Sequence, residues 1–372
     1  MKGLTSWFAY GATLAALVLA TACKKEVEKI VVQQVDKTYS WSEAKQLYGT
    51  DRIVLGMAKD ANTVYLQVPN ALGILSPAKS YPTYRQYYTS ASAAMPSDIN
   101  LRIPITADFF ARPYLGANVI VSSTKDPVNS GANAAIVLRQ LDSRASGVAT
   151  NYLSFAKFGA FSRNNFLLFG YETDLGQADP QLHFILASVR LVAGQVQVQP
   201  QVLNIPRTSR YRSSYIRMLT AIDDYFLADC GDEGIYKIQE NGVLTRVYQP
   251  AIVDTFYKWQ GTLYALEEYN ILLSSTDDGT TWQRRADAPG IFAFNAYHVI
   301  SDSLVGITHG FGGNTLFTLR WNSSNYRVRL LKNDGLEQAS VSGLEQLGDT
   351  VYIGTTSGLF KRPLSKFFET KQ

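Results

Sequence analysis

The chain has 372 residues, of which 46% are hydrophobic, 12% aromatic and 18% charged. This balance excludes a disordered chain, a coiled coil and a protein with many membrane-spanning helices. The formal net charge of +4, from 35 basic and 31 acidic residues, is too small to indicate a nucleic-acid partner. With 27 glycines, 13 prolines, 22 tyrosines and 18 phenylalanines, the composition favours strands and turns.

The N-terminus has the form of a secretory signal. A basic start at Lys2 precedes an uncharged, almost wholly apolar segment from Trp7 to Ala20, and small residues then lead to Cys23. These are the three regions of a signal peptide, and the apolar run is shorter than the roughly 20 residues that a membrane-spanning helix needs. An uncleaved anchor is the alternative. We therefore predict a signal peptide over residues 1–22.

A cysteine directly after Ala20-Thr21-Ala22 resembles the lipobox of bacterial lipoproteins. The family prefers Leu three residues before the cysteine, where this chain has Ala20. The resemblance implies that Cys23 is acylated and anchors the protein to a membrane. Because Cys230 is the other of only two cysteines, such an exported chain would contain no intramolecular disulfide.

Residues 23–50 are expected to form the lipidated cysteine and its tether. The charged segment 24–29 resembles the surface-export signal of Bacteroidetes lipoproteins, and a plain hydrophilic linker is the alternative. The resemblance implies an outer-membrane lipoprotein that is displayed at the cell surface rather than in the periplasm.

Short apolar strands recur along the rest of the chain. In the C-terminal half they begin at Tyr225, Leu263, Leu304 and Val351, which are 38, 41 and 47 residues apart. Each is followed, seven to eleven residues after its start, by a second short strand. Further units with looser spacing begin at three earlier positions, Thr63, Val119 and Phe166.

A recurrence near 40 residues with several short strands per unit is typical of propeller blades. The pattern predicts an all-β fold with a single six- or seven-bladed β-propeller over residues 51–372, seven being preferred. We expect the seven recurring strands to be the inner strands of the blades. A β-sandwich is the alternative fold, but it does not predict this recurrence.

Residues 275–282 match the pattern S-x-D-x-G-x-T-W at every fixed position, namely Ser275, Asp277, Gly279, Thr281 and Trp282. The segment is similar to the Asp-box, or BNR repeat, of sialidases and related propellers. The resemblance implies a structural loop at the outer rim, away from the ligand face. In such a loop Asp277 accepts backbone N–H bonds, Gly279 supplies a positive φ, and Trp282 packs between the sheets of its blade.

A second sialidase-like feature lies earlier in the chain. The segment 101–104 resembles the Arg-Ile-Pro element of sialidases, which implies that Arg102 binds substrate and that Asp126, 24 residues later, is the acid catalyst. A guanidinium group suits the sialic acid carboxylate. Hydrolysis also needs a tyrosine nucleophile polarised by a glutamate. Where the family places that tyrosine, this chain has Ser340-Val341-Ser342. We therefore expect Arg102 and Asp126 to share the central cavity without hydrolysing sialosides.

Two other segments supply candidate ligand-binding residues. Segment 207–217 contains four arginines, among them Arg207, Arg210 and Arg212, which suit an anionic sugar or an acidic protein surface. Segment 81–88 contains four tyrosines, among them Tyr84 and Tyr87, which suit sugar stacking or a protein interface. The alternatives are a solvated connection between blades and packing against the propeller edge.

No motif indicates a metal or a cofactor, because the aspartate pairs at 223–224 and 277–278 lack the spaced oxygens of a calcium loop. The sequence therefore predicts a lipid-anchored envelope propeller that acts as a non-catalytic binding or scaffold module. Its expected partners are the membrane, through Cys23, and a glycan, a peptide or an outer-membrane protein. A sialidase-type glycoside hydrolase is the alternative, so the question of catalysis stays open.

Overall fold

The computed structural model describes residues 39–44, 52–69, 71–78, 82–86, 104–114, 118–125, 132–145, 159–175, 178–208, 216–249, 252–267, 271–285, 295–310, 313–322, 325–336 and 339–371. The chain divides into two units, Met1–Thr38 and Tyr39–Gln372, and all described residues belong to the second unit. The predicted signal peptide and Cys23 lie outside the described residues. Within the described ranges, no helix has the length and apolar character needed to cross a membrane.

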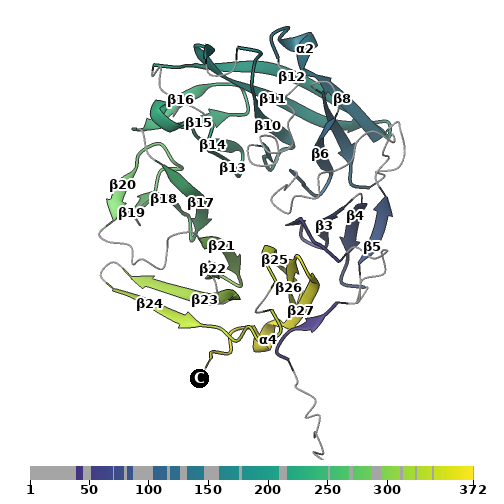
Figure 1. The fold of residues 1–372 in the computed structure, drawn as a ribbon, viewed down its shortest axis with the longest axis vertical. Helices are drawn as coiled ribbons and strands as arrows, with labels where there is room; N and C mark the ends of the chain where they lie inside the picture. Colours follow the sequence, from purple (N-terminus) through teal and green to yellow (C-terminus); the bar gives the residue numbers. More distant parts are fainter. Residues whose placement is uncertain are drawn as a thin grey trace, which may run out of the picture. The chain divides into compact units, whose positions relative to one another are not determined.

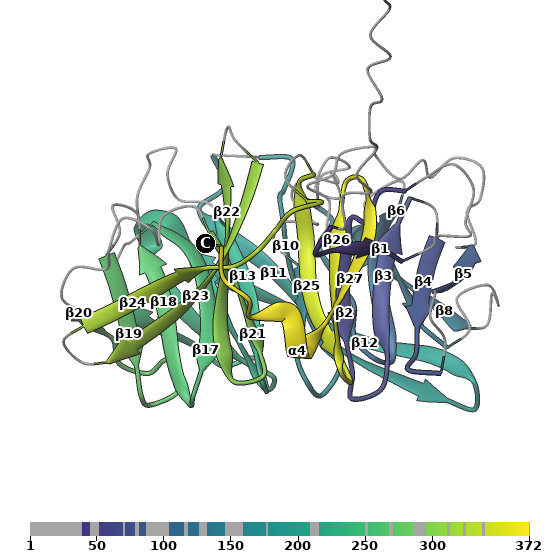
Figure 2. The same cartoon turned by 90° about the horizontal axis from the view of Figure 1, so that it is seen from below.

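The described strands form seven antiparallel sheets arranged in a ring, as Figure 1 shows. Most strands run roughly along the ring axis (Figure 2). In the described residues, six sheets have four strands and one has three. The fold is therefore a seven-bladed β-propeller, which confirms the fold class predicted from the sequence.

Blades 1 to 4 follow one another along the chain. Blade 1 contains β2 (Gly56–Lys59), β3 (Val64–Val68), β4 (Ala71–Leu75) and β5 (Thr83–Gln86). Blade 2 contains β6 (Phe109–Tyr114), β7 (Asn118–Ser123) and β8 (Asn133–Val137), followed by the short helix α2 (Leu138–Leu141). Blade 3 contains β9 (Gly159–Phe161), β10 (Phe166–Tyr171), β11 (Gln181–Val192) and β12 (Gln195–Pro206). Blade 4 contains β13 (Met218–Ile222), β14 (Tyr225–Asp229), the 3-10 turn η3 (Gly231–Glu233), β15 (Ile235–Gln239) and β16 (Leu244–Tyr248).

Blades 5 to 7 complete the ring. Blade 5 contains β17 (Val253–Trp259), β18 (Thr262–Glu267), β19 (Ile271–Ser275) and β20 (Gln283–Arg285). Blade 6 contains β21 (Asn295–Ile300), β22 (Ser303–Gly310), β23 (Gly313–Asn322) and β24 (Asn325–Leu330). Blade 7 contains β25 (Val341–Leu347), β26 (Thr350–Thr355), β27 (Gly358–Pro363) and, from the other end of the chain, β1 (Ser42–Glu43); the helix α4 (Leu364–Phe367) follows β27.

The seven recurring strands of the sequence are the second strands of the blades, so their expected position as inner strands is wrong. The innermost strands are β2, β6, β9, β13, β17, β21 and β25. The reason is burial on two faces. In β3 and β14 every residue is buried, whereas β20 is exposed throughout. A strand that is covered on both faces consists of an uninterrupted run of apolar residues. The inner and outer strands of a blade lack such a run.

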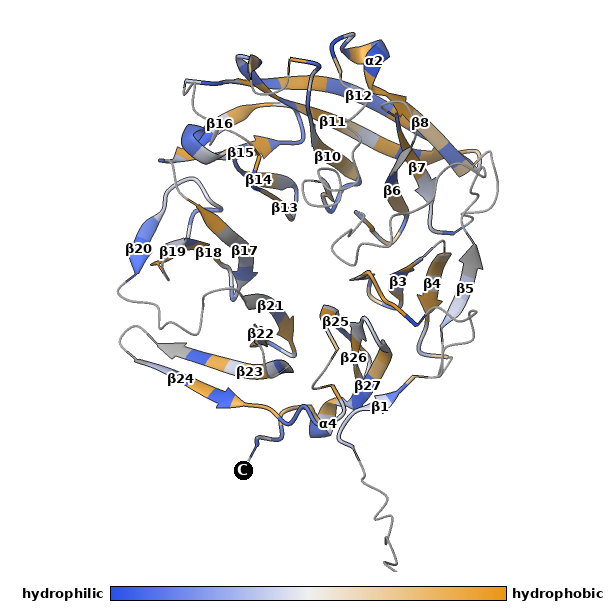
Figure 3. Ribbon diagram, in the orientation of Figure 1, coloured by the Kyte–Doolittle hydropathy of each residue, from blue (hydrophilic) through white to orange (hydrophobic). Residues whose placement is uncertain are grey.

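The hydrophobic core consists of layers between neighbouring blades. Alternate residues of one strand face opposite blades, as the two-residue period of a strand requires. Phe226 of β14 belongs to the cluster shared with blade 3, and the next residue, Leu227, belongs to the cluster shared with blade 5. Hydrophobic segments accordingly appear on the strands of every blade in Figure 3. Each blade is stabilised mainly by its two neighbours, which is why the ring must close.

The ring closes through the N-terminal strand. β1 pairs antiparallel with β27, with Ser42 opposite Lys361 and Glu43 opposite Phe360. The predicted tether over residues 23–50 therefore includes residues of the propeller, because Ser42 and Glu43 form its edge strand. Two residues of an edge strand carry no readable pattern, and their partner lies at the opposite end of the chain.

The two ends of each blade differ. We call the end with the turns between first and second strands the hairpin face, and the opposite end, with the connections between second and third strands, the connection face. The hairpin turns contain residues with positive φ, including Asn165, Asp223, Gln260 and Ser301. They also join blades, because Trp259 donates from Nε1 to the carbonyl of Asp302 at 3.0 Å.

Candidate functional site

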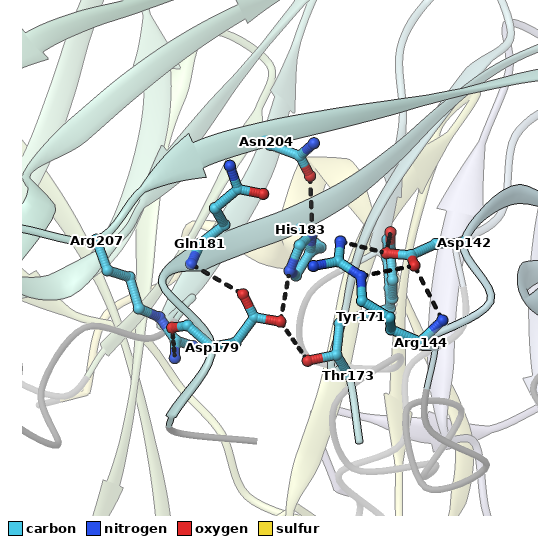
Figure 4. Close-up of polar contacts among 9 residues, drawn as sticks. All are labelled: Asp142, Arg144, Tyr171, Thr173, Asp179, Gln181, His183, Asn204 and Arg207. Carbon is cyan, nitrogen blue, oxygen red and sulfur yellow. Dashed lines mark hydrogen bonds and ion pairs between the residues drawn. The ribbon is translucent and has the colours of Figure 1, made fainter. Parts of the chain in front are cut away.

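Several residues expected to form a site lie outside the described residues: Arg102, Asp126, Arg210, Arg212 and Tyr87. The described residues instead reveal a polar cluster on the connection face of blade 3, drawn in Figure 4. It is built where β10 ends and β11 begins, with Tyr171 directly opposite His183 in the pair of strands.

The centre of this cluster is a buried histidine–aspartate pair. His183 Nε2 lies 3.0 Å from Asp179 Oδ2, and both side chains are only 2% exposed. The other ring nitrogen, Nδ1, lies 2.7 Å from Asn204 Oδ1 on β12 (Figure 4). Asp179 also accepts hydrogen bonds from the Thr173 hydroxyl and from the backbone N–H of Gln181.

The electrostatic balance at Asp179 favours the carboxylate. Burial acts to raise the pKa of Asp179, but the hydrogen bonds from Thr173, His183 and Gln181 outweigh it and hold that pKa below its ordinary value. The cluster thus stabilises an ionised group inside the protein by saturating its oxygens. A lone buried charge would be strongly unfavourable.

A second part of the cluster links blade 3 to blade 2. Tyr171 donates its hydroxyl to Asp142 Oδ2 at 2.9 Å, and Arg144 donates from Nε and Nη2 to the two oxygens of Asp142 at 3.0 Å each. The bidentate Arg144 bonds, with Tyr171, lower the pKa of Asp142 to about 2. The rings of Tyr171 and His183 lie 5.2 Å apart, so the two parts are in contact.

Arg207 lies at the edge of this cluster and has a structural contact. Its Nη1 donates to the backbone carbonyl of Asp179 at 3.0 Å. The next residue, Thr208, donates from its N–H and its hydroxyl to the carboxylate of Glu233, each at 2.7 Å. The start of the arginine-rich segment therefore ties the connection after β12 to blades 3 and 4.

The geometry limits what the cluster can do chemically. A general base must reach the proton that it removes, and the side chains of His183 and Asp179 are shielded from solvent. No group of acidic, histidine or cysteine residues suited to a metal occurs within the described ranges. The cluster therefore holds the connections of blades 2, 3 and 4 in place on one face of the ring.

Sequence reasoning missed this cluster. Its partners come from separate segments of the chain, and Asn204 meets His183 only through the register of β11 with β12. One signal was available: His183 interrupts an otherwise apolar segment of the strand, Leu182 to Ala187. A polar residue in such a strand needs a partner.

Tyr84 shows the edge packing that the sequence left open as an alternative. It is half-buried on β5, and its ring lies over Gly73, where a Cβ atom would come within 2.8 Å of Tyr84 Cε1. Burial raises the pKa of the Tyr84 hydroxyl well above its ordinary value. The small size of Gly73 makes the space that this tyrosine fills.

The segment Ser275–Trp282 forms the loop between β19 and β20 on the hairpin face of blade 5. Asp277 Oδ1 accepts the backbone N–H of Thr281 at 2.9 Å and the hydroxyl of Ser275 at 2.7 Å, and Oδ2 accepts the hydroxyl of Thr281 at 2.6 Å. Gly279 has a φ of 78°. Both the acceptor role of Asp277 and the positive φ were expected from the sequence.

Trp282 closes the loop but packs differently from the expectation. Its Nε1 donates to the carbonyl of Gly279 at 3.1 Å, and its half-buried ring joins the core cluster shared by blades 4 and 5. Its ring centroid is 6.2 Å from that of Phe256. The tryptophan thus packs between two blades, because the faces of each sheet are covered by the neighbouring blades.

We predict that Asp277→Ala lowers the melting temperature, because three loop hydrogen bonds lose their acceptor. These bonds, from Thr281 first, hold the pKa of Asp277 below its ordinary value. Their stabilisation is therefore present above the ordinary carboxyl pKa and is lost as the pH falls through the lowered one. Melting curves from neutral to acidic pH should show the difference from wild type shrinking in acid. Thr276→Ala, at an exposed position of the same loop, is the control, and equal melting of both variants would contradict the prediction.

The inner strands of blades 7 and 1 contain a second titratable contact. Glu345 of β25 is 21% exposed, and its Oε2 lies 3.7 Å from Lys59 Nζ of β2. Burial raises the pKa of Glu345 to about 7 despite the nearby lysine. The carboxyl group is therefore easier to protonate in the folded chain than in the unfolded chain.

This contact predicts a pH dependence of stability. A raised pKa contributes stability that is fully present below the unfolded value of about 4.3 and is lost as the pH rises through about 7. We expect the melting temperature to fall between mildly acidic and mildly basic pH, and Glu345→Gln to flatten this decline. An unchanged slope in the variant, measured by circular dichroism, would show that another group is responsible.

Solved structures of other proteins show distant likenesses to this chain. No protein-family model matches the chain, and no curated protein matches it by sequence. The computationally designed Ika8 protein is 12% identical at a TM-score of 0.49, over 86% of this chain and 98% of the designed one. BamB from Moraxella catarrhalis is 11% identical at a TM-score of 0.44, over 84% of each chain. The Pan2 WD40 domain of Neurospora crassa is 8% identical at a TM-score of 0.48, over 88% of this chain and 97% of that domain. At these identities and TM-scores the likenesses assign no function, and the seven-bladed fold rests on the strand pairing described above.

Proposed function

We propose that this protein is a lipid-anchored β-propeller of a bacterial envelope that acts as a non-catalytic binding or scaffold module. The propeller fold is compatible with such a module, and its two faces offer surfaces for a glycan, a peptide or an outer-membrane protein. The observation that carries the non-catalytic part is the buried cluster of blade 3. Its histidine and Asp179 are enclosed within blade 3, and the carboxylate of Asp142 joins blade 2 to blade 3.

The anchoring part rests on the apolar N-terminal segment and on Cys23 after three small residues. Residues 24–38 then separate Cys23 from Tyr39, where the propeller unit begins. An extended segment of this length spans at most about 50 Å. We infer an outer-membrane lipoprotein displayed at the cell surface, with a periplasmic location as the alternative.

The anchor is tested by growing a bacterial host with a clickable fatty acid. We expect wild type to incorporate the label and Cys23→Ser to lose it. Cys230→Ser is the matched control, because Cys230 is fully buried and burial raises the pKa of its thiol. Label that persists in Cys23→Ser would overturn the anchor.

A relation to Asp-box propellers is part of the same proposal, supported by Ser275, Asp277, Gly279, Thr281 and Trp282 at the fixed positions of that pattern. It brings a second candidate function, a sialidase-type glycoside hydrolase that uses Arg102 and Asp126. A fluorogenic sialoside separates the two functions. We expect no turnover; turnover that is abolished by Asp126→Ala would establish the hydrolase instead.

A further inference from the structure

The outer rim of blade 6 carries a group of exposed arginines. Arg327 and Arg329 lie on β24, and Arg320 lies directly opposite Arg327 on β23. All three are exposed, and no ion pair joins any of them to an acidic group in the described part of the chain. Residues 313–330 contain no aspartate or glutamate at all.

This arrangement is unfavourable for the isolated fold. Like charges directly opposite each other on neighbouring strands destabilise a sheet, and Arg320 opposite Arg327 is such a pair. The exposed Arg190 and Arg246, on blades 3 and 4, lie opposite Gln197 and Tyr236 and not opposite another arginine. On blade 5, Arg284 has Glu267 at 3.5 Å. The uncompensated charge on blade 6 is explained most simply by an anionic surface outside the chain.

The same strand exposes apolar side chains. Tyr326 and Leu330 are 48% and 45% exposed, and they alternate with Arg327 and Arg329 along β24. Figure 3 shows hydrophilic and hydrophobic segments together on this strand. Because successive residues of a strand point to opposite faces of the sheet, the arginines and the apolar side chains flank the rim from its two sides, and a surface that approaches β24 edge-on meets both sets. This combination is typical of protein surfaces that lie in the headgroup region of a membrane.

The rim of blade 6 also adjoins the start of the propeller unit. Ser40 donates from its N–H and its hydroxyl to the carboxylate of Asp334, at 2.7 and 2.5 Å. Asp334 follows the last residue of β24 by four positions. At its other edge, β24 receives the C-terminal segment, because Lys371 donates its backbone N–H to the carbonyl of Leu330 at 3.0 Å. The first residues of the unit are thus held against the segment that follows β24.

We propose that the rim of blade 6, formed by Arg320, Arg327, Arg329, Tyr326 and Leu330, docks onto an anionic lipid surface. The proposal adds an orientation to the anchoring proposed above. A propeller that rests on its rim keeps both the hairpin face and the connection face open to partners. An acidic protein segment would also complement the charge of the arginines. The exposed Tyr326 and Leu330, together with the adjacent start of the propeller unit, favour lipid instead.

The test uses residues 24–372, which retain the whole closed ring and lack both Cys23 and the apolar N-terminal segment. Vesicles of phosphatidylglycerol and phosphatidylcholine, and vesicles of phosphatidylcholine alone, are sedimented with the protein at low ionic strength. We expect binding to the anionic vesicles only, and its loss at high salt. At about 1 kcal/mol for each basic residue near such a surface, Arg327→Gln with Arg329→Gln should weaken the partition about 25-fold.

The matched control is Arg190→Gln with Arg246→Gln, which removes the same charge from exposed positions on blades 3 and 4. We expect this pair to bind as wild type does. Equal losses in the two double variants, or no binding of wild type to anionic vesicles, would overturn the proposal. Binding to poly-L-glutamate but not to vesicles would also overturn it and assign the rim to an acidic protein. Because the protein tested lacks Cys23, none of these outcomes depends on acylation, which the fatty-acid label reports separately.

Discussion

Asp179→Ala is expected to lower the free energy of unfolding by about 3–5 kcal/mol, because buried donors lose their acceptor at a cost of about 1–3 kcal/mol each. The Thr173 hydroxyl and the N–H of Gln181 lose their acceptor, and His183 Nε2 loses its 3.0 Å contact with Asp179. Buried polar groups without partners are costly. Urea denaturation of the purified protein, followed by tryptophan fluorescence, gives the free energy directly.

Two controls make this result specific. Asp174→Ala changes an exposed aspartate of the same connection and should alter stability by less than about 0.5 kcal/mol. Asp179→Asn keeps one oxygen acceptor but not the charge, so it should lie between wild type and Asp179→Ala. The lowered pKa of Asp179 adds a pH signature, since its stabilisation is present above the ordinary carboxyl pKa and is lost as the pH falls through the lowered one. If Asp179→Ala and Asp174→Ala unfold alike, the buried contacts of Asp179 do not stabilise the fold.

Trp41→Ala is expected to lower the free energy of unfolding by a similar amount, about 3–5 kcal/mol, as for other buried aromatic side chains. Trp41 is 3% exposed and lies directly before β1. Its ring packs edge-on against Phe367, with centroids 6.0 Å apart, in the cluster shared by blades 6 and 7. The substitution therefore opens a cavity where the two ends of the chain meet.

Tyr39→Ala is the matched control for ring closure. It removes an aromatic side chain two residues away that is 52% exposed, so it should change stability far less than Trp41→Ala. Hydrogen exchange should also show faster exchange in β27 of the Trp41→Ala variant, because β1 protects that strand's outer edge. Equal stability of the two variants would mean that the ring is closed without the N-terminal strand.

The sequence by itself determined the class of fold. All seven recurring apolar strands are second strands of blades, because a strand buried on both faces must be apolar throughout. The loop at residues 275–282 could also be predicted from the sequence, since its hydrogen bonds join residues two to four positions apart. Local patterns of this kind need no knowledge of the rest of the chain.

Only the tertiary structure decided which residues meet across long distances in the chain. The pairing of β1 with β27 joins residues about 319 positions apart, and His183 finds Asn204 through strand register. The rim of blade 6 is assembled in the same way, from β23, β24 and the first and last described segments of the unit. Such contacts produce no periodic pattern in the sequence, because each residue depends on a partner that is close in space and not on its neighbours in the chain. Apolar periodicity therefore reveals the blades, whereas the polar contacts that close the ring and shape its surfaces appear only when the chain is folded.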